Sequence, residues 1–342
     1  MNRLPTIVDV AHAAGVSRQT VSNVLNTPAM VREDTRHRVE SAIERLGYRP
    51  HASARRLRTQ RSSTIGVRLE PSTNGVSGAL LDRFLHTLTE QAEGQGLRVV
   101  LYTARDAEHE IAQFSRLIDG ADVDGLILTS TFFGDPRTEW LVDHNQRFVT
   151  FGRPWGISDL DDPQHFWVDV DGRDGVRQAT AHLLGDGAQT VAFLGWPRGS
   201  GTGDERRRGW DDALTDAGIP ASARIEAETV ESIPAARAAT LELLKAHPEV
   251  DALVAVSDTA ALGALMASDG ALPVVGFDNT AVAESIGFSS VDQRLDVVAE
   301  DILRLLAEVG TTSSAHPDAH TLVTPELVTR PRSAALSLLH HP

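Results

Sequence analysis

The stretch TIVDVAHAAGVSRQTVSNVLN, residues 6–26, contains two short amphipathic patterns that meet at a glycine. The first pattern has apolar residues at the spacing of one buried helix stripe, namely Ile7, Val10, Ala11 and Ala14. Thr6 precedes it and Asp9 follows three residues later, as in a capping box. Gly15 ends this helix, and Ser17 caps a second one. The inner face of the second helix consists of Val21, Val24 and Leu25. The sequence therefore predicts two short helices joined by a tight turn.

Polar side chains cover the other face of the predicted second helix. Arg18, Gln19 and Asn23 have the hydrogen-bonding groups that read base edges in the major groove. The neighbouring hydroxyl and amide groups are suited to holding phosphates: Thr6, Ser17, Thr20, Ser22 and Asn26. A third amphipathic helix, with Val39, Ala42, Ile43 and Leu46 on its inner face, ends at Gly47. Together these features predict a helix-turn-helix whose second helix enters the major groove.

The charge is divided unevenly along the chain. Residues 1–62 contain 11 arginines and 5 acidic residues, whereas the remainder contains 21 basic and 42 acidic residues. A basic segment binds polyanions by releasing counterions, and an acidic segment is repelled by DNA. We therefore expect double-stranded DNA to bind at the N-terminal end.

Composition excludes several classes of protein. A length of 342 residues predicts two or three domains, since a domain usually has roughly 100–200 residues. The absence of cysteine excludes disulfides, thiolate metal sites and cysteine nucleophiles. No apolar run reaches the roughly 18 residues that cross a bilayer, and the N-terminus lacks the apolar segment of a signal peptide. We expect a cytoplasmic protein that has no membrane partner.

Beyond residue 62 the chain alternates short apolar runs with amphipathic helical runs, which is the pattern of βα units and parallel sheets. We expect strands near 64–69, 97–102, 125–129, 147–151, 190–195, 225–230, 252–257 and 273–277. Helices are expected between them, for example at 79–94, 172–186, 204–217, 234–246 and 259–268. Because this region is long for one open sheet, the sequence predicts two α/β lobes with a cleft between them.

The cleft is expected to bind a small molecule, because open α/β sheets place ligands beyond the carboxyl ends of their strands. Six candidate side chains follow predicted strands: Arg153, Trp155, Trp196, Ser257, Asp258 and Asp278. Aromatic faces stack on a sugar ring, while arginine and carboxylate groups bind its hydroxyls. Two alternatives stay open, since Asp258 could merely cap a helix and the tryptophans could merely pack between the lobes.

Motifs of catalysis are missing from the sequence. The glycine-rich run at residues 199–203 has arginine where a dinucleotide-binding loop needs its third glycine, and no P-loop lysine follows. Neither Gly-x-Ser-x-Gly nor His-Glu-x-x-His is present, and the 13 histidines lack paired zinc spacing. We therefore expect no enzyme activity, no cofactor and no metal.

The stretch from Ile7 to Asn26 resembles the lactose-repressor/galactose-repressor (LacI/GalR) family of bacterial transcription regulators. The resemblance continues through Gly47-Tyr48-Arg49-Pro50, Ala54-Arg55-Arg56-Leu57, Thr64-Ile65-Gly66-Val67 and Pro325-Glu326-Leu327, and covers essentially the whole chain. Three positions depart from the family's usual pattern: Asn23 replaces an arginine, Arg32 a helix-capping serine and His51 an asparagine. The first departure bears on which operator is read.

The resemblance implies a helix-turn-helix head at 1–49, a hinge helix and linker at 50–62, and an effector-binding and dimerisation body at 63–342. The body would resemble periplasmic sugar-binding proteins, with the chain crossing between lobes near 163, 291 and 323. Its N-lobe would comprise 63–163 and 292–322, and its C-lobe 164–291 and 323–334. The hinge would insert into the minor groove through Ala54, Arg55 and Leu57. Arg206 and Asp278 would hold the effector, and Gln293 would lie near the mouth of the effector site. The alternative for Arg206 is a solvated side chain in a run of arginines.

We therefore expect a homodimeric, sequence-specific repressor that binds operator DNA and responds to a small-molecule effector, a sugar or oligosaccharide. A purine or another non-sugar effector is an alternative, because aromatic stacking suits bases as well. A sugar-modifying enzyme with a DNA-binding head is a second alternative, which turnover of the ligand would reveal.

Overall fold

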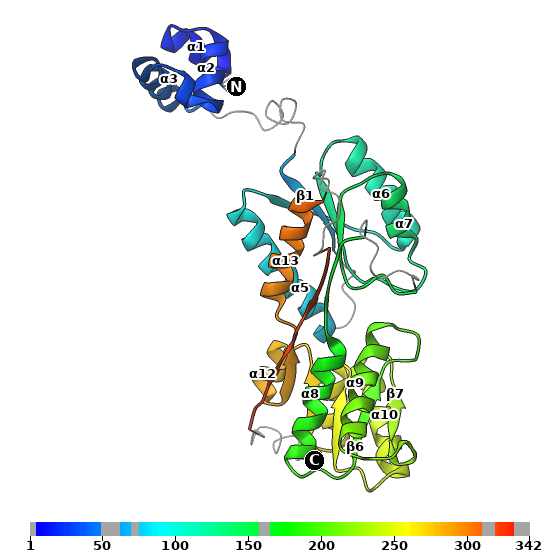
Figure 1. The fold of residues 1–342 in the computed structure, drawn as a ribbon. Coiled ribbons are helices and arrows are strands. Elements are labelled where there is room, and N and C mark those ends of the chain that lie inside the picture. Colours follow the sequence, from blue (N-terminus) through cyan, green and yellow to red (C-terminus); the bar gives the residue numbers. More distant parts are fainter. Residues whose placement is uncertain (1–4, 49–61, 70–74, 157–164, 310–318, 332–342) are drawn as a thin grey trace. The chain divides into compact units, whose positions relative to one another are not determined.

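The computed structural model describes residues 5–48, 62–69, 75–156, 165–309 and 319–331 (Figure 1). The predicted hinge residues Ala54, Arg55 and Leu57 lie outside these ranges, as does the crossing predicted near 163. The chain divides into two compact units: residues 1–62, which contain the head, and the body at 63–342.

The head is a three-helix domain. It consists of α1 (Ile7–Ala14), α2 (Arg18–Asn26), the 3-10 turn η1 (Pro28–Met30) and α3 (Glu33–Leu46). The backbone N–H and the hydroxyl of Thr6 both donate to Asp9 Oδ2 at 2.7 Å. Gly15 ends α1 with a φ of +65°, and Ser17 Oγ accepts from the backbone N–H of Thr20 at 3.1 Å. One small core joins the helices: Val10, Ala11, Ala14, Val21, Val24, Val39, Ala42 and Tyr48. The predicted helix-turn-helix is confirmed.

The N-terminal lobe of the body is built on a six-stranded parallel sheet of order β11-β5-β4-β3-β1-β2. Its strands are β1 (Thr64–Arg68), β2 (Arg98–Tyr102), β3 (Gly125–Leu128), β4 (Phe148–Phe151), β5 (Trp167–Val170) and β11 (His320–Val323). Its helices are α5 (Gly75–Gly94), α6 (Ala107–Asp119), α7 (Pro136–Asp143) and α13 (Leu295–Glu308). Helix α13 packs on α5, β4 and β5, so the C-terminal part of the chain completes this lobe.

The C-terminal lobe is built on a second six-stranded sheet, of order β12-β10-β9-β8-β6-β7. Its strands are β6 (Val191–Gly195), β7 (Glu226–Glu228), β8 (Ala252–Ala255), β9 (Val274–Phe277), β10 (Ser289–Asp292) and β12 (Glu326–Val328). Its helices are α8 (Gly172–Gly185), α9 (Thr202–Asp216), η2 (Ala221–Ala223), α10 (Ile233–Ala246), α11 (Asp258–Ala267) and α12 (Ala281–Ile286). All strand pairs are parallel except β10 with β12. The predicted two-lobed α/β class is confirmed.

The chain passes between the two sheets three times. The first passage lies between Val170 and Gly172, because β5 pairs with β4 and β11 in the first sheet. The predicted passage near 163 was therefore too early, since the short strand β5 was not recognised. The chain returns between β10 and α13, where a crossing was predicted near 291, and passes back between β11 and β12, where one was predicted near 323.

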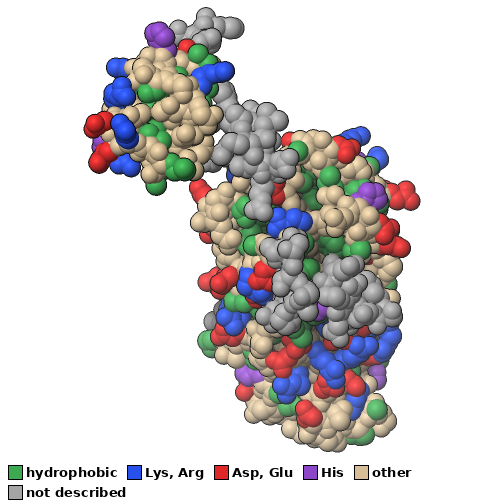
Figure 2. Space-filling view, turned by 45° about the horizontal axis from the view of Figure 1, so that its top comes forward, with side chains coloured by type: hydrophobic (Ala, Val, Ile, Leu, Met, Phe, Trp, Pro, Cys, Tyr) green, Lys and Arg blue, Asp and Glu red, His purple; other side chains and the backbone are tan. Residues whose placement is uncertain are grey.

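The centre of each sheet is apolar. Strand β8 is buried along its whole length, as a parallel strand covered by helices on both faces should be. On the visible surface of the body, acidic and basic side chains lie interspersed rather than in one field of a single sign (Figure 2). Many of them form ion pairs, such as Arg177 with Asp174 at 2.7 Å. Among the described residues, no helix is long and apolar enough to span a membrane.

Candidate DNA-binding and effector sites

The exposed face of α2 presents the predicted base-reading residues. Arg18 and Gln19 are exposed and Asn23 is half-buried, while Val21 and Val24 anchor the opposite face in the core. Gln19 Nε2 donates to Asn23 Oδ1 at 2.9 Å, so these two amides are one helical turn apart on the same face. The local geometry therefore presents a polar helix face of the kind that enters a major groove.

The predicted phosphate-binding side chains lie at both ends of α2 and at the start of α1. The hydroxyls of Ser17 and Thr20 are 2.9 Å apart at the N-terminus of α2, where unpaired backbone N–H groups favour an anion. Asn26 Nδ2 donates to the backbone carbonyl of Ser22 at 2.6 Å, and the Thr6 hydroxyl is engaged with Asp9. At the start of α3, Arg32 occupies the cap position without a side-chain capping bond.

In the body, Arg206 of α9 is at the centre of the polar cluster beyond the strand ends. Its side chain is buried, with Nη1 donating to the Val256 carbonyl at 2.6 Å. Its guanidinium carbon lies 3.7 Å from the centroid of the Phe277 ring and 5.4 Å from that of Trp196. Arg206 Nε is buried and finds no hydrogen-bond partner among the described residues. A buried donor without a partner is costly.

Asp278 follows β9 and faces Arg206. Its carboxylate Oδ1 lies 3.8 Å from Arg206 Nη2 and accepts a hydrogen bond from Gln293 Nε2 at 2.6 Å. The backbone of Asp278 has a φ of +112°, a region that favours glycine and that marks strain at functional positions. Burial raises the pKa of the Asp278 carboxyl to about 8; Arg206 opposes this shift, and the nearby carboxyl of Asp258 adds to it.

Ser257 and Asp258 are engaged within the protein. Ser257 Oγ caps α11 by accepting from the backbone N–H of Ala260 at 3.2 Å. Asp258 is fully buried, and its two carboxylate oxygens accept hydrogen bonds from Thr280 and from the Ser290 hydroxyl. This arrangement joins α11 to β10 and to the start of α12, so Asp258 has a structural role whatever it does toward a ligand.

Glu231 is part of the cluster, although it is not among the residues predicted from the sequence. It accepts from Trp196 Nε1 at 2.6 Å and from Ser257 Oγ at 2.9 Å. The indole of Trp196 is thereby held beside Arg206. The rule that selected Asp278 could have found Glu231 too, because it directly follows the strand predicted at 225–230.

The N-terminal lobe contributes Arg153 and Trp155, which follow β4. Arg153 Nε donates to Asp169 Oδ2 at 2.7 Å, and its Nη1 lies 3.7 Å from Glu205 of the C-terminal lobe. Its guanidinium carbon is 4.8 Å from the centroid of the Trp155 ring. Burial raises the pKa of the Asp169 carboxyl, while Arg153 opposes the shift. Asp169 was not predicted as a site residue either, because it lies in strand β5, which was not among the predicted strands.

Trp155 touches the opposite lobe at Gly201. A Cβ atom at Gly201, whose φ is +67°, would lie 2.4 Å from Trp155 Cδ2, so no larger residue fits there. A second interlobe contact joins Arg83 of α5 to Asp292 at 3.1 Å. Asp292 also accepts from Asn279, the neighbour of Asp278, at 2.7 Å. The polar cluster and the contacts between the lobes are therefore connected.

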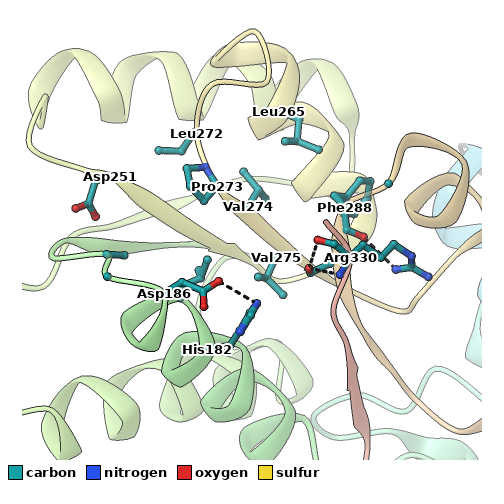
Figure 3. Close-up of a pocket in the computed structure, with 15 residues that line it drawn as sticks. His182, Asp186, Asp251, Leu265, Leu272, Pro273, Val274, Val275, Phe288 and Arg330 are labelled. Carbon is teal, nitrogen blue, oxygen red and sulfur yellow. Dashed lines mark hydrogen bonds and ion pairs between the residues drawn. The ribbon is translucent and has the colours of Figure 1, made fainter. Parts of the chain in front are cut away.

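The body has one hollow away from this cluster and another that Trp155 lines in part. The first, about 410 Å³, lies at the opposite ends of the strands, where Pro273 and Val274 begin β9 (Figure 3). In Figure 3 His182 faces Asp186 across 3.6 Å, and Phe288 and Arg330 line the other end. The predicted effector residues do not line it. The second hollow, about 510 Å³, is lined in part by Trp155 and lies in the N-terminal lobe.

The head and the body each match a known family. Residues 6–51 match the model of bacterial regulatory proteins of the lacI family. Residues 80–272 match that of periplasmic binding proteins and the sugar-binding domain of the LacI family. The HTH-type transcriptional regulator CelR of Thermobifida fusca is 33% identical over 338 residues, covering 92% of this chain and 94% of its own.

The chain belongs to the LacI family of bacterial regulatory proteins. The HTH-type transcriptional regulator GalS of Salmonella typhimurium is 34% identical over 324 residues, covering 93% of this chain and 91% of its own. Among solved structures, the complex of the transcriptional regulator CelR with cellobiose matches with a TM-score of 0.67 at 28% identity, covering 96% of this chain and all of the other. From its family and these relatives, the chain is a DNA-binding transcriptional regulator.

Within this LacI-family body, the predicted effector residues fall into three groups. The first is the buried cluster of Trp196, Arg206, Asp278 and Gln293. The second faces it from the other lobe and consists of Arg153 and Trp155. The third, Ser257 and Asp258, is engaged in capping and in joining elements. Among the described residues, no group of acidic or histidine side chains is arranged to hold a metal ion.

Proposed function

We propose that this chain is a repressor that binds operator DNA as a homodimer and that is controlled by a sugar bound between the two lobes of its body. Arg18, Gln19 and Asn23 would read bases, and the hydroxyl and amide side chains of α1 and α2 would hold phosphates. The protein would act in the cytoplasm, where its DNA lies, and would release its ligand chemically unchanged.

The observation that carries the sugar assignment is the cluster around Arg206. The buried Nε without a partner, the carboxylate of Asp278 and the amide of Gln293 offer donors and acceptors within a few ångströms. The indoles of Trp196 and Trp155 supply apolar faces on opposite lobes. A sugar ring needs this combination, and the relative CelR has been solved as a cellobiose complex.

Control by the ligand would follow from linkage. The proposed effector residues come from both lobes, since Arg153 and Trp155 follow β4 of the N-terminal lobe whereas Arg206 and Asp278 belong to the C-terminal lobe. Arg153 also lies 3.7 Å from Glu205 of the C-terminal lobe. A ligand that contacts both lobes has different affinities for different lobe arrangements, and only that difference shifts their populations. The affinity for the operator would change by a coupling of about 5- to 150-fold.

A screen of ligands followed by a DNA-binding assay tests the proposal. Full-length protein is heated with mono- and disaccharides, sugar phosphates and purines, since a ligand of the folded state raises the melting temperature. Each hit is then added to the protein bound to a DNA fragment that it selected from a random pool. We expect a sugar to stabilise the protein and to change its DNA affinity. A response to purines alone would contradict the sugar assignment, and recovery of a chemically altered ligand would contradict the regulator without enzyme activity.

A further inference from the structure

Two amide side chains on the outward face of α2 form a pair. Gln19 Nε2 donates to Asn23 Oδ1 at 2.9 Å, and the two residues lie one helical turn apart. This bond uses one of the two lone pairs of Asn23 Oδ1 and sets which side of the amide carries the oxygen. Asn23 Nδ2 donates to no other described residue. The half-buried Asn23 therefore presents an oriented amide that has two N–H donors and one lone pair for a partner outside the head.

The third amide of α2 is arranged differently. Asn26 Nδ2 donates to the backbone carbonyl of Ser22 at 2.6 Å and to the Ser22 hydroxyl at 3.2 Å. The Asn26 amide is thereby turned back onto the last turn of its own helix. Of the amides of α2, the one at Asn23 is thus the one whose nitrogen is left for DNA while its oxygen is already oriented by a neighbouring side chain.

The four bases differ in what they offer to such an amide in the major groove. Adenine places the acceptor N7 beside the donor N6 amino group, so the amide N–H and the amide oxygen can both be paired on one base. Guanine places two acceptors there, N7 and O6, and the amide oxygen would face O6 without a donor. Cytosine offers a donor, whereas thymine offers an acceptor beside a methyl group. The hydrogen-bonding groups of Asn23 therefore match adenine.

We propose that Asn23 reads an adenine in the operator, with Nδ2 donating to N7 and Oδ1 accepting from the N6 amino group. Gln19 is the positioning residue for this contact, because its bond to Oδ1 orients the Asn23 amide before DNA binds. The inference rests on the proposed base reading by α2 and deepens it by naming the base. An arginine at position 23 would offer only donors and would select guanine instead.

Selection of DNA from a random pool by the full-length protein tests this assignment. The selection is run with the unchanged protein and with Asn23→Ala and Asn23→Arg, so that the base pair that depends on position 23 is identified. Gel-shift titrations then compare the selected site with sites in which this base is guanine, or is 7-deazaadenine, which lacks the N7 acceptor. Gln19→Ala is measured alone and together with Asn23→Ala. The matched control is Asn26→Ala, which removes an amide of the same helix that is bonded to Ser22.

We expect adenine at the base pair that depends on Asn23, with guanine there weakening binding about 5- to 150-fold and 7-deazaadenine weakening it as well. Asn23→Ala should remove this discrimination, and Asn23→Arg should change the preference to guanine. Gln19→Ala should reduce the discrimination at the same base pair, but should have no further effect on it in the Asn23→Ala background. The control Asn26→Ala should weaken binding to the adenine and guanine sites alike.

Three results would overturn the assignment while leaving sequence-specific binding intact. They are a base other than adenine at the pair that depends on Asn23, full affinity for the 7-deazaadenine site, and a selected site in which no pair depends on Asn23. Equal losses of discrimination from Gln19→Ala in both backgrounds would overturn the positioning role of Gln19. If the unchanged protein selects no sequence at all, the proposed base reading by α2 fails, and the adenine assignment fails with it.

Discussion

Replacing Arg137 with methionine removes the centre of a buried ion-pair network in the N-terminal lobe. Arg137 and Glu110 are both fully buried, with Nη1 of the arginine 2.8 Å from Glu110 Oε2. Arg137 also donates to Asp135 through Nη2 at 2.6 Å and to the Thr129 and Ser130 carbonyls at 3.2 Å. Methionine preserves the apolar volume and removes every one of these donors.

The expected loss follows from what the substitution leaves behind. Glu110 keeps Arg68 at 2.8 Å and the Tyr102 hydroxyl at 3.0 Å, so its charge stays partly compensated. Asp135, whose side chain is 6% exposed, loses its only ion-pair partner among the described residues. Removing one partner of a buried pair costs about 3–5 kcal/mol, and we expect the free energy of unfolding of the body to fall by that amount. Binding of the effector should weaken too, because Thr131 of the same loop donates to the Arg153 carbonyl at 2.9 Å.

Urea denaturation followed by tryptophan fluorescence measures this loss, because all five tryptophans belong to the body. The matched control is Arg177→Met, which removes an ion pair with Asp174 from a side chain that is 48% exposed. The control should lose less than about 1 kcal/mol. A loss for Arg137→Met as small as that of the control would refute the reasoning that the network stabilises the lobe.

Three further predictions concern function. Arg18→Ala should lose about 1–3 kcal/mol of affinity on the selected operator, and an equal loss on scrambled DNA in a gel-shift assay would refute base reading. Burial raises the pKa of Asp278 to about 8, above its value in the unfolded chain, so between about pH 4 and 8 the folded state binds a proton that the unfolded state has lost. The contribution of Asp278 to stability therefore falls as pH rises from about 4 to 8. Asp278→Asn should flatten that part of the melting-temperature profile and abolish the effector response while operator binding persists; an unchanged profile or an intact response would count against it. Gly201→Ala should weaken effector binding at least about fivefold, because its Cβ would collide with Trp155 and because a φ of +67° with a ψ of −79° strains any residue that has a Cβ. Calorimetry with unchanged affinity would show that the lobes need not meet there.

The sequence predicted best what is decided locally. Capping by Thr6 and Ser17 and the left-handed Gly15 all lie within a few residues of the helices they end, so the head followed directly from its pattern. Strand β8 was found because it is apolar throughout. The four strands that escaped prediction, β5, β10, β11 and β12, contain polar residues such as Asp169 and Ser290 and gain their place only through pairing with distant segments.

The same distinction applies to the candidate site. The strand-end rule located Arg153, Trp196 and Asp278, because a strand's end is a local feature. The roles of Ser257 and Asp258 depend on partners far along the chain, since Asp258 binds Thr280 and Ser290, and no pattern around residue 258 indicates them. The contact of Trp155 with Gly201 requires the two lobes to meet, which lies beyond any local signal.

The final described segment supplies an outer strand to each sheet, β11 to the first and β12 to the second. During synthesis, neither sheet of the body is therefore complete until the segment from His320 to Val328 has left the ribosome. The head precedes the body in the chain and encloses its own core, so it can fold before the body is complete. A message truncated before residue 320 would yield a folded DNA-binding head on a body with β5 and β10 as open edges, which are templates for aggregation.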